Sequence, residues 1–450
     1  MLKAGTAKRV INSELGTQVQ AASHMKTVQR IRDDLEANVL WIQSGDCGML
    51  FISCDLIGLD MDYVRELLPA VAGAAGVDRD SVLIGCTHTH SGPSICGPSH
   101  PEKSIEHAYL ERLRDWLCDA AREAVSSAEE VEIAWGAGSA EIGYNRRVCF
   151  ADGSRVMHGD PSRPDATGLE GPNDPRHTAL FVRAPGGDLR AVLYNNTAHP
   201  TNFYGADFLS ADFPGLARKY LREVFGQLPV LFFNGTIGDI TVMEECWRRR
   251  TPETAEQRVA RAAHLVTGET LRLLQRAEFR AEAALAHRVA HFDAQLRDLP
   301  EERLEWARRL MQGYREGKRD ETMLVYAKAN GTLLFHERFG GRSSERVDIH
   351  AGLIGGLAFA TAPCELFCHF GMQLKRRSPF AATAVFGITN GTTGYCPTIE
   401  GAMGGSWEGA VALGSRWDVK TGYRIVDEWC RMLYEIRKGN SASGRAAPAQ

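Results

Sequence analysis

The stretch SVLIGCTHTHSGP, residues 81–93, decides the fold, because in it an apolar segment leads directly into two histidines. Residues 81–86 have the composition of a buried β-strand. His88 and His90 follow at i and i+2, a spacing that can project both side chains to one side. Neutral imidazole is the commonest metal ligand, and catalytic groups often lie where strands give way to loops. The stretch predicts a metal or catalytic site at a strand end; the alternative interpretation is two polar residues in a turn.

Two more apolar strands end in a similar way. Residues 191–200, AVLYNNTAHP, place His199 after a strand, and the proline that follows restricts the direction of the chain. Residues 229–241, PVLFFNGTIGDIT, end a third strand in a glycine-rich turn at Gly238 and Asp239, where backbone N–H groups can approach a substrate closely. We expect the three strand ends to form one shared site.

The alternation of short apolar strands with amphipathic helices predicts an α/β (α+β) fold, with a layered mixed β-sheet core flanked by helices. We expect a single domain over residues 1–438 and a disordered tail over residues 439–450, which are small and polar. Residues 254–320 predict a helical section that inserts into or covers this domain. The Gly- and Pro-rich residues 153–176 predict a long ordered loop, and residues 365–376 predict a helix.

Composition limits the cellular setting and the partners. The 450 residues are 44% hydrophobic and 24% charged, with a net charge of −4, which gives no general attraction to nucleic acid or anionic membranes. No apolar run approaches the roughly 18 residues that span a bilayer, and the first residues lack the apolar segment of a secretory signal. The 11 cysteines are odd in number and scattered. We expect a cytoplasmic protein with reduced thiols, no membrane span and no nucleic-acid partner; its oligomeric state stays open.

Several other site chemistries are disfavoured. The chain has no Gly-x-Ser-x-Gly elbow after a strand, which a serine hydrolase of the α/β type needs, and no His-Glu-x-x-His helix of the metalloprotease type. It also has no P-loop and no dinucleotide fingerprint in the required context. The histidine-bearing strand ends are therefore the strongest candidates.

The order of motifs along the chain resembles that of the N-terminal catalytic domain of the neutral (non-lysosomal) ceramidase family. The motifs that carry this resemblance are LKAGTAK at residues 2–8, SCDLIG at 53–58, THTHSGP at 87–93, YNR at 144–146, NNTAH at 195–199, SAD at 210–212, NGTIGD at 234–239, APCE at 362–365 and GY at 394–395. They extend over nearly the whole chain, to about residue 410. The resemblance implies the layered α/β fold expected above and an amide-hydrolysing activity.

The resemblance also implies roles for individual residues. The family binds one catalytic zinc ion through two histidines, a glutamate and a tyrosine, which correspond here to His88, His199, Glu365 and Tyr395. His90 would act as general acid and base, and Arg146, assisted by Tyr144, would stabilise the oxyanion. Without the resemblance, Glu365 would be an ordinary residue in the first turn of a helix and Tyr395 a loop aromatic.

The chain also departs from the family pattern. Ceramidases carry a serine in the segment where this chain has Thr241, so either Thr241 takes part or an activated water is the only nucleophile. The tyrosine-rich stretch of the family is replaced by residues 396–401, and we expect the C-terminal immunoglobulin-like domain of the ceramidases to be absent. These departures favour a smaller and more polar substrate than ceramide.

The resulting hypothesis is a zinc-dependent hydrolase that cleaves the carboxamide C–N bond of a small cytoplasmic substrate with metal-activated water. Two alternatives stay open. One is an ester, lactone or phosphoester hydrolase that uses the same zinc ion. The other is a binding protein that keeps the scaffold without catalysis.

Overall fold

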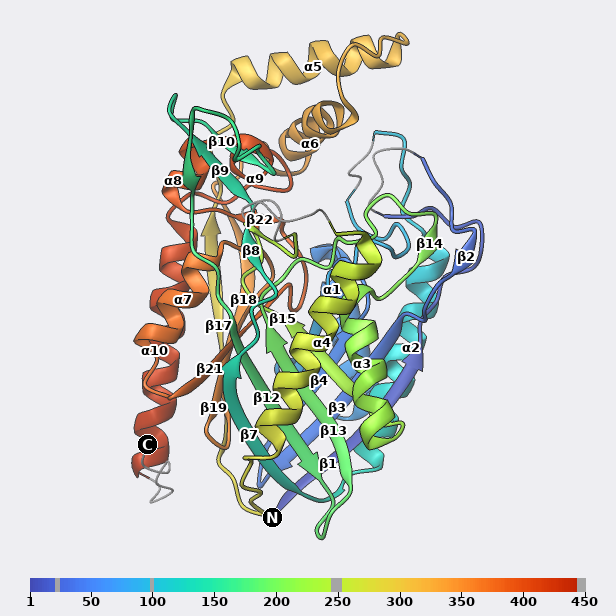
Figure 1. Cartoon of the computed structure of the whole chain (residues 1–450), viewed down its shortest axis with the longest axis vertical. Coiled ribbons are helices and arrows are strands. Elements are labelled where there is room, and N and C mark those ends of the chain that lie inside the picture. The colour runs from blue at the N-terminus through green and yellow to red at the C-terminus, as the bar shows by residue number, and fades with distance from the viewer. Residues whose placement is uncertain (21–24, 98–100, 244–252, 443–450) are drawn as a thin grey trace.

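The computed structural model describes residues 1–20, 25–97, 101–243 and 253–442 (Figure 1). Three sheets of four or five strands form the core of the described part. The first has the order β5-β4-β3-β1-β6, with strands Val82–Cys86, Cys47–Cys54, Glu36–Ser44, Leu2–Val10 and Glu129–Glu130. The second has the order β15-β13-β12-β7, with strands Val230–Asn234, Leu189–Asn196, Arg176–Arg183 and Glu132–Ser139. The third has the order β17-β18-β19-β21, with strands Leu285–Gln295, Ser344–Ile354, Leu357–Ala362 and Ala382–Gly387.

All three sheets share one topological element. Each is antiparallel except at one edge, where β4 pairs in parallel with β5, β13 with β15 and β19 with β21. Between the two strands of each pair the chain crosses over through a helix: α1 (Met61–Ala75), α3 (Asp212–Phe225) and α7 (Cys368–Arg377), respectively. Because the carboxyl ends of parallel strands lie at the same edge, each pair brings two loops together there.

The strands of these sheets are buried on both faces. In β4, Met49 and Phe51 face a central core shared by the three sheets, whereas Leu50 and Ile52 face α1 and α2 (His107–Ser126). β12 and β19 show the same alternation between the central core and their own helices. Burial on both faces explains why these strands appear in the sequence as continuous apolar runs.

Four phenylalanines from the three sheets meet at the centre of the shared core. They are Phe51 on β4, Phe233 on β15, Phe359 on β19 and Phe386 on β21. The ring centroids lie 4.5 Å apart for Phe233 and Phe386, and 5.5 Å apart for Phe51 and Phe359. Gly85 in β5 leaves room for this packing, since a Cβ atom there would lie 2.4 Å from the ring of Phe233. The three sheets are therefore fixed to one another by direct aromatic contact.

Helices cover the outer face of each sheet (Figure 1). α1 and α2 pack on the first sheet, α3 and α4 (Ala255–Leu274) on the second, and α7 and α10 (Thr421–Ala442) on the third. The predicted fold class, a layered mixed-sheet α/β core flanked by helices, is confirmed.

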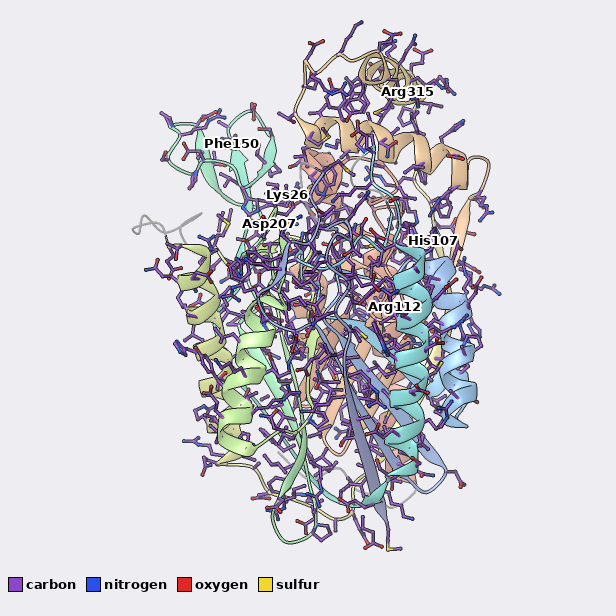
Figure 2. The ribbon with its side chains drawn as sticks, turned by 90° about the vertical axis from the view of Figure 1, so that its right-hand side faces the viewer. Lys26, His107, Arg112, Phe150, Asp207 and Arg315 are labelled. Atoms are coloured by element: carbon purple, nitrogen blue, oxygen red, sulfur yellow. The ribbon has the colours of Figure 1, made fainter. Side chains whose placement is uncertain are left out.

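Smaller elements gather at one end of the molecule. In Figure 2, Phe150 marks the small sheet β10-β9-β11 and Arg315 marks the end of α5; both lie at that end. The bounds of these elements are Arg155–Met157, Arg147–Phe150 and Ala166–Leu169 for the sheet, and Glu301–Arg315 and Met323–Phe339 for α5 and α6. The remaining elements are β2 (Arg30–Ile31), β8 (Tyr144–Asn145), β14 (Phe208–Leu209), β16 (Ile240–Thr241), β20 (Glu365–Leu366), β22 (Tyr395–Cys396), α8 (Ile399–Met403), α9 (Ser406–Gly409) and the short 3₁₀ helix Arg79–Ser81.

Some elements differ from those expected from the sequence. Residues 153–176 are not one loop, because β10 and β11 lie within them and pair with β9. The helix expected from residue 365 begins at Cys368 instead, because the two residues of β20 pair with β22. α10 extends to Ala442, so residues 439–442 are helical, and the rest of the expected tail lies outside the described residues.

Two further findings concern the described part of the chain. Every cysteine in it is a free thiol. None of its helices combines the length and apolar character that a membrane crossing requires.

Removal of one central ring should strongly destabilise the protein. We predict that Phe51→Ala lowers the free energy of unfolding by about 3–5 kcal/mol, because it leaves a cavity between three rigid sheets. Tyr434→Ala is the matched control, since Tyr434 on α10 is 50% exposed. Chemical denaturation followed by tryptophan fluorescence measures both effects. A loss for Phe51→Ala no larger than that for Tyr434→Ala would contradict the assignment of the core.

A buried histidine should make the fold sensitive to acid. His177 on β12 is fully buried, its Nε2 lies 2.9 Å from the Thr270 hydroxyl, and burial lowers its pKa to about 4. The unfolded chain takes up this proton at about pH 6.5, so the stabilising contribution is present above that pH and is lost as the pH falls toward 4. We predict that, relative to His177→Gln, wild type loses about 3 kcal/mol of unfolding free energy between pH 7 and pH 4. Urea titrations at both pH values measure it; a constant difference would contradict it.

Candidate metal centre

His88 lies where the chain turns away from the end of β5. Its backbone is left-handed, with φ 72°, and its N–H donates to the carbonyl of Leu56, which follows β4, over 2.9 Å. The side chain is fixed from the same segment, because Nδ1–H donates to the carbonyl of Ile57 over 2.5 Å. That hydrogen bond sets the tautomer: Nε2 of His88 carries a lone pair and points away from β4.

His199 is held in the same manner by a different sheet. It follows β13 and is fully buried, and its Nδ1–H donates to the carbonyl of Ile237, which follows β15, over 3.0 Å. Asn234, at the end of β15, clamps the preceding residue, because its side chain bonds both the N–H and the carbonyl of Ala198. Nε2 of His199 therefore also presents a lone pair.

Glu365 and Tyr395 reach the site from the third sheet. They follow β19 and β21, respectively, and face each other in register across the parallel pair β20 and β22. Both side chains are oriented toward each other, since the Tyr395 hydroxyl donates to the Glu365 carboxylate and so opposes the rise in the carboxyl pKa that burial causes. Oε2 of Glu365 is buried and has no hydrogen-bond partner in the described part of the protein.

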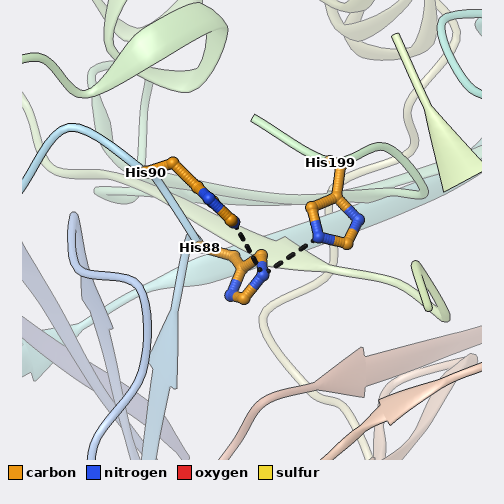
Figure 3. Close-up of side chains that lie close together, drawn as sticks. All are labelled: His88, His90 and His199. Atoms are coloured by element: carbon orange, nitrogen blue, oxygen red, sulfur yellow. Dashed lines mark hydrogen bonds between the residues drawn. The ribbon is translucent and has the colours of Figure 1, made fainter. Parts of the chain in front are cut away.

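The free acceptor atoms of His88, His199 and Glu365 lie close together. Figure 3 shows the two imidazoles with His90 beside them. Nε2 of His88 lies 3.1 Å from Nε2 of His199 and 3.6 Å from Oε2 of Glu365. Nε2 of His199 lies 3.3 Å from the same carboxylate oxygen. Three lone-pair atoms thus form a triangle, each corner supplied by a different sheet.

At neutral pH neither histidine of this triangle carries the extra proton that would let it donate a hydrogen bond to the other two atoms. Burial lowers the pKa of His88 to about 4, and it lowers the pKa of His199 well below the usual value, with Arg146 adding to the effect. Two neutral imidazoles whose remaining lone pairs face each other repel unless a cation lies between them. A tetrahedral site with ligand distances of about 2.0 Å has edges of about 3.3 Å, and the three measured separations bracket that value. The donor set therefore fits a metal ion.

His90 lies beside the triangle. Its Nε2 is 3.2 Å from Nε2 of His88, and its Nδ1 is buried without a hydrogen-bond partner in the described part of the protein. Burial, followed by the neighbouring histidines, lowers its pKa well below the usual value. All three histidines are close enough to hold a metal together, but only His88 and His199 are oriented by backbone carbonyls, whereas His90 is less fixed.

Arg146 approaches the site from the opposite side. Its guanidinium donates to the carbonyl of Gly238 over 2.9 Å and to the Tyr395 hydroxyl over 3.4 Å. Its Nε donates to Glu408 over 3.1 Å, and Glu408, with a fully buried side chain, also accepts from Arg147 over 2.8 Å. Sequence reasoning missed Glu408, because nothing in the local sequence around α9 marks it; only the fold brings it to the two arginines.

The Gly238–Asp239 turn contributes structure to the site. A Cβ atom at Gly238 would lie 2.5 Å from the carbonyl of Glu365, so glycine allows the turn to pack directly against β20. The Asp239 carboxylate accepts from the N–H of Cys368 over 2.7 Å and from Asn145 over 2.8 Å, and burial raises its pKa to about 7. Gly238 and Asp239 are not among the described residues that line the cavity, and the turn connects the second and third sheets behind the candidate ligands. The expected approach of this turn to a substrate stays a prediction.

Two of the expected catalytic residues lie behind the wall of the site. Tyr144 on β8 and Thr241 on β16 pair with each other across a short antiparallel ladder, and both are buried. Neither is among the described residues that line the cavity. The Tyr144 hydroxyl is 3.4 Å from the carbonyl of Glu141, and Thr241 accepts from the N–H of Met243 over 3.3 Å. These contacts are typical of a supporting role.

A large cavity opens onto the triangle. Its volume is about 1200 Å³, and it extends from the three histidines to α6 and α9. His158 lies on its wall with a left-handed backbone and an N–H that donates to the carbonyl of Arg146 over 2.7 Å. The candidate centre is therefore accessible to a molecule of substantial size.

Comparisons with known proteins agree with this geometry at the level of the fold. No protein-family model matches the chain, and no curated protein matches it. Among solved structures, neutral ceramidase from Pseudomonas aeruginosa is similar, with a TM-score of 0.71 and 15% identity over 97% of this chain and 75% of that one. A ceramidase complexed with C2 has a TM-score of 0.70 and 13% identity over 100% of this chain and 76% of that one. The chain thus has the fold of neutral ceramidase.

Proposed function

We propose that the protein is a zinc-dependent hydrolase that cleaves a carboxamide C–N bond. One observation carries the proposal: the triangle of lone-pair atoms from His88, His199 and Glu365, with edges between 3.1 and 3.6 Å and no proton to hold it. A mixed set of nitrogen and oxygen donors in this geometry is typical of catalytic zinc sites. The ceramidase fold supports the choice of amide chemistry.

Four residues would hold the zinc ion, namely His88, His199, Glu365 and Tyr395. The carbonyls of Ile57 and Ile237 orient the two imidazoles by accepting from their Nδ1–H groups, an arrangement that fixes metal-ligating histidines in other proteins. When bound, zinc polarises a carbonyl and lowers the pKa of a water molecule. The residues around it supply the remaining functions.

His90 would move the proton. Its low pKa leaves it neutral at pH 7, so it can accept a proton from the attacking water at Nε2, the nitrogen that faces the site. The same nitrogen can then protonate the departing amine. This second transfer matters more for amides than for activated esters, because an amine leaves only after it is protonated, whereas an activated aryloxide leaves without a proton.

Arg146 would stabilise the negative charge that develops on the carbonyl oxygen. Glu408, Gly238 and Tyr395 hold its guanidinium in place, and neighbouring carboxylates and the tyrosine keep its pKa raised despite burial. A cation fixed in advance in a site of low polarity does not have to reorganise as the charge forms.

The proposed zinc ion can be measured directly. Protein purified without added zinc should contain about one equivalent of zinc by elemental analysis, because the four ligands are fixed by the fold rather than by the ion. His88→Ala and Glu365→Ala should each lose most of the zinc and the amide hydrolysis. His264→Ala is the control, since His264 is exposed on α4 and stacks only on Tyr220. A metal content below a tenth of an equivalent, with activity that survives chelation, would refute the proposal.

A matched pair of amide and ester substrates tests the proposed role of His90. His90→Ala should lower kcat/KM for an N-alkyl amide by about 10²–10⁴-fold, because proton delivery to the amine is lost. For the p-nitrophenyl ester of the same acid the loss should be much smaller, since nitrophenolate leaves without a proton. Zinc content should stay near that of wild type. Equal losses on the two substrates would show that His90 does not protonate the leaving group.

A further inference from the structure

The cationic side chains that line the cavity fall into two groups. Five arginines each form an ion pair with a carboxylate: Arg65 with Asp62, Arg146 with Glu408, Arg338 with Asp60, Arg346 with Asp293 and Arg416 with Glu345. Lys328 and Arg342 form no ion pair with any carboxylate in the described part of the chain. Arg342 is exposed near the ring of Phe339, whereas Lys328 is half-buried.

Lys328 of α6 lines the cavity, and within the described residues its ammonium has one hydrogen-bond partner. Its ammonium donates to the carbonyl of Ser406, the first residue of α9, over 2.6 Å. An ammonium has three donors, so two N–H groups remain for another partner. Glu408, which holds Arg146 beside the metal centre, lies two residues further along α9. One short helix thus ties Lys328 to the reactive end of the cavity.

The surroundings of Lys328 destabilise its positive charge, because no carboxylate of the described residues pairs with it. Burial, together with the positive charges of Arg303 and Arg147 and against the opposing charge of Glu408, lowers the pKa of Lys328 to about 8. Apolar side chains on the same wall, including Leu324 and Ala327 of α6 and Trp407 of α9, reduce the access of water. A partly desolvated cation among other cations is stabilised when an anion binds to it.

Charge is also distributed unevenly over the molecule. The chain as a whole has a net charge of −4. Of the charged side chains that line the cavity, however, two cations, Lys328 and Arg342, and only one carboxylate, Glu365, stand outside these arginine–carboxylate pairs, so positive charge is in excess. A cavity lined by an excess of one sign concentrates ligands of the opposite sign. The cavity is therefore adapted to an anionic molecule rather than to a neutral lipid.

We propose that Lys328 binds an anionic group of the substrate. The protein would then hydrolyse carboxamides that carry a second, acidic group, either a carboxylate or a phosphate-like group. That group would lie on the part of the substrate that reaches α6. This inference rests on the proposed function for the reaction itself, but the recognition of the anion can be measured without turnover. An N-acylated amino acid is the simplest molecule of this class.

Calorimetry with stable analogues tests the recognition directly. The probes are N-octanesulfonylglycine, N-octanesulfonyl-aminomethylphosphonate and neutral N-octanesulfonyl-ethanolamine, in which a sulfonamide that resists hydrolysis replaces the carboxamide. Wild type should bind at least one of the two acids tenfold or more tightly than the neutral probe, and the tighter acid distinguishes a carboxylate site from a phosphate site. Lys328→Met should remove that preference and leave the affinity for the neutral probe within about threefold.

Lys318→Met is the matched control. Lys318 lies between α5 and α6, is 63% exposed and pairs with Glu316 outside the cavity. It should keep the wild-type preference, and thermal melting should show that both variants are folded. Equal affinity of wild type for the acids and the neutral probe, or an unchanged preference in Lys328→Met, would overturn the inference. Neither result would affect the zinc measurement, so the inference and the proposed function can fail separately.

Discussion

The packing of three sheets around one aromatic centre is the constraint on which the rest of the structure depends. Phe51, Phe233, Phe359 and Phe386 touch one another from three sheets, so none of the sheets can shift without opening a cavity in the common core. Each sheet ends in a parallel pair at one edge, and the loops that leave these pairs carry the candidate ligands. The separations between His88, His199 and Glu365 are thus set by core packing rather than by local loop structure. Such a site is formed before any ion binds, and little reorganisation is needed when it does.

The lone pairs of the candidate ligands repel one another, and a bound cation would remove this repulsion. Two neutral imidazoles and a carboxylate oxygen are buried with unused lone pairs directed at one another, and their backbone partners prevent them from turning away. A cluster of buried acceptor atoms that are aimed at one another is typical of a functional site. The same burial keeps His90 neutral, whereas Tyr395 and the neighbouring carboxylates keep Arg146 charged despite burial. These are the protonation states that acid–base catalysis and anion stabilisation need.

The sequence predicted the strands and the histidines well because both depend on local pattern. Continuous apolar runs identified strands buried on two faces, and the residues that follow them, His88, His90 and His199, meet in space as expected. Glu365 had no such signal: it lies in a two-residue strand formed by pairing with β22, a long-range contact that local propensity does not encode. The sequence did not predict Glu408 and Lys328 as site residues for the same reason, since their partners lie far away in the sequence. The turn at Gly238 was recognised, but its glycine is required by the carbonyl of Glu365 rather than by a ligand.

Glu408 links the chemistry of the site to the choice of substrate. Its carboxylate is shared by Arg146 and Arg147, so a single negative charge serves two cations, and Glu170 supplies a second carboxylate only to Arg147. Part of the positive charge of Arg146 therefore stays available for an oxyanion. A carboxylate that paired with Arg146 alone would neutralise that charge more fully. The carbonyl of Ser406, at the start of the same short helix, holds Lys328 without neutralising it. α9 thus holds two incompletely compensated cations at the cavity, Arg146 near the candidate metal centre and Lys328 on α6. A substrate with a developing charge at one point and a permanent charge at another satisfies both, and an uncharged lipid would leave Lys328 unpaired.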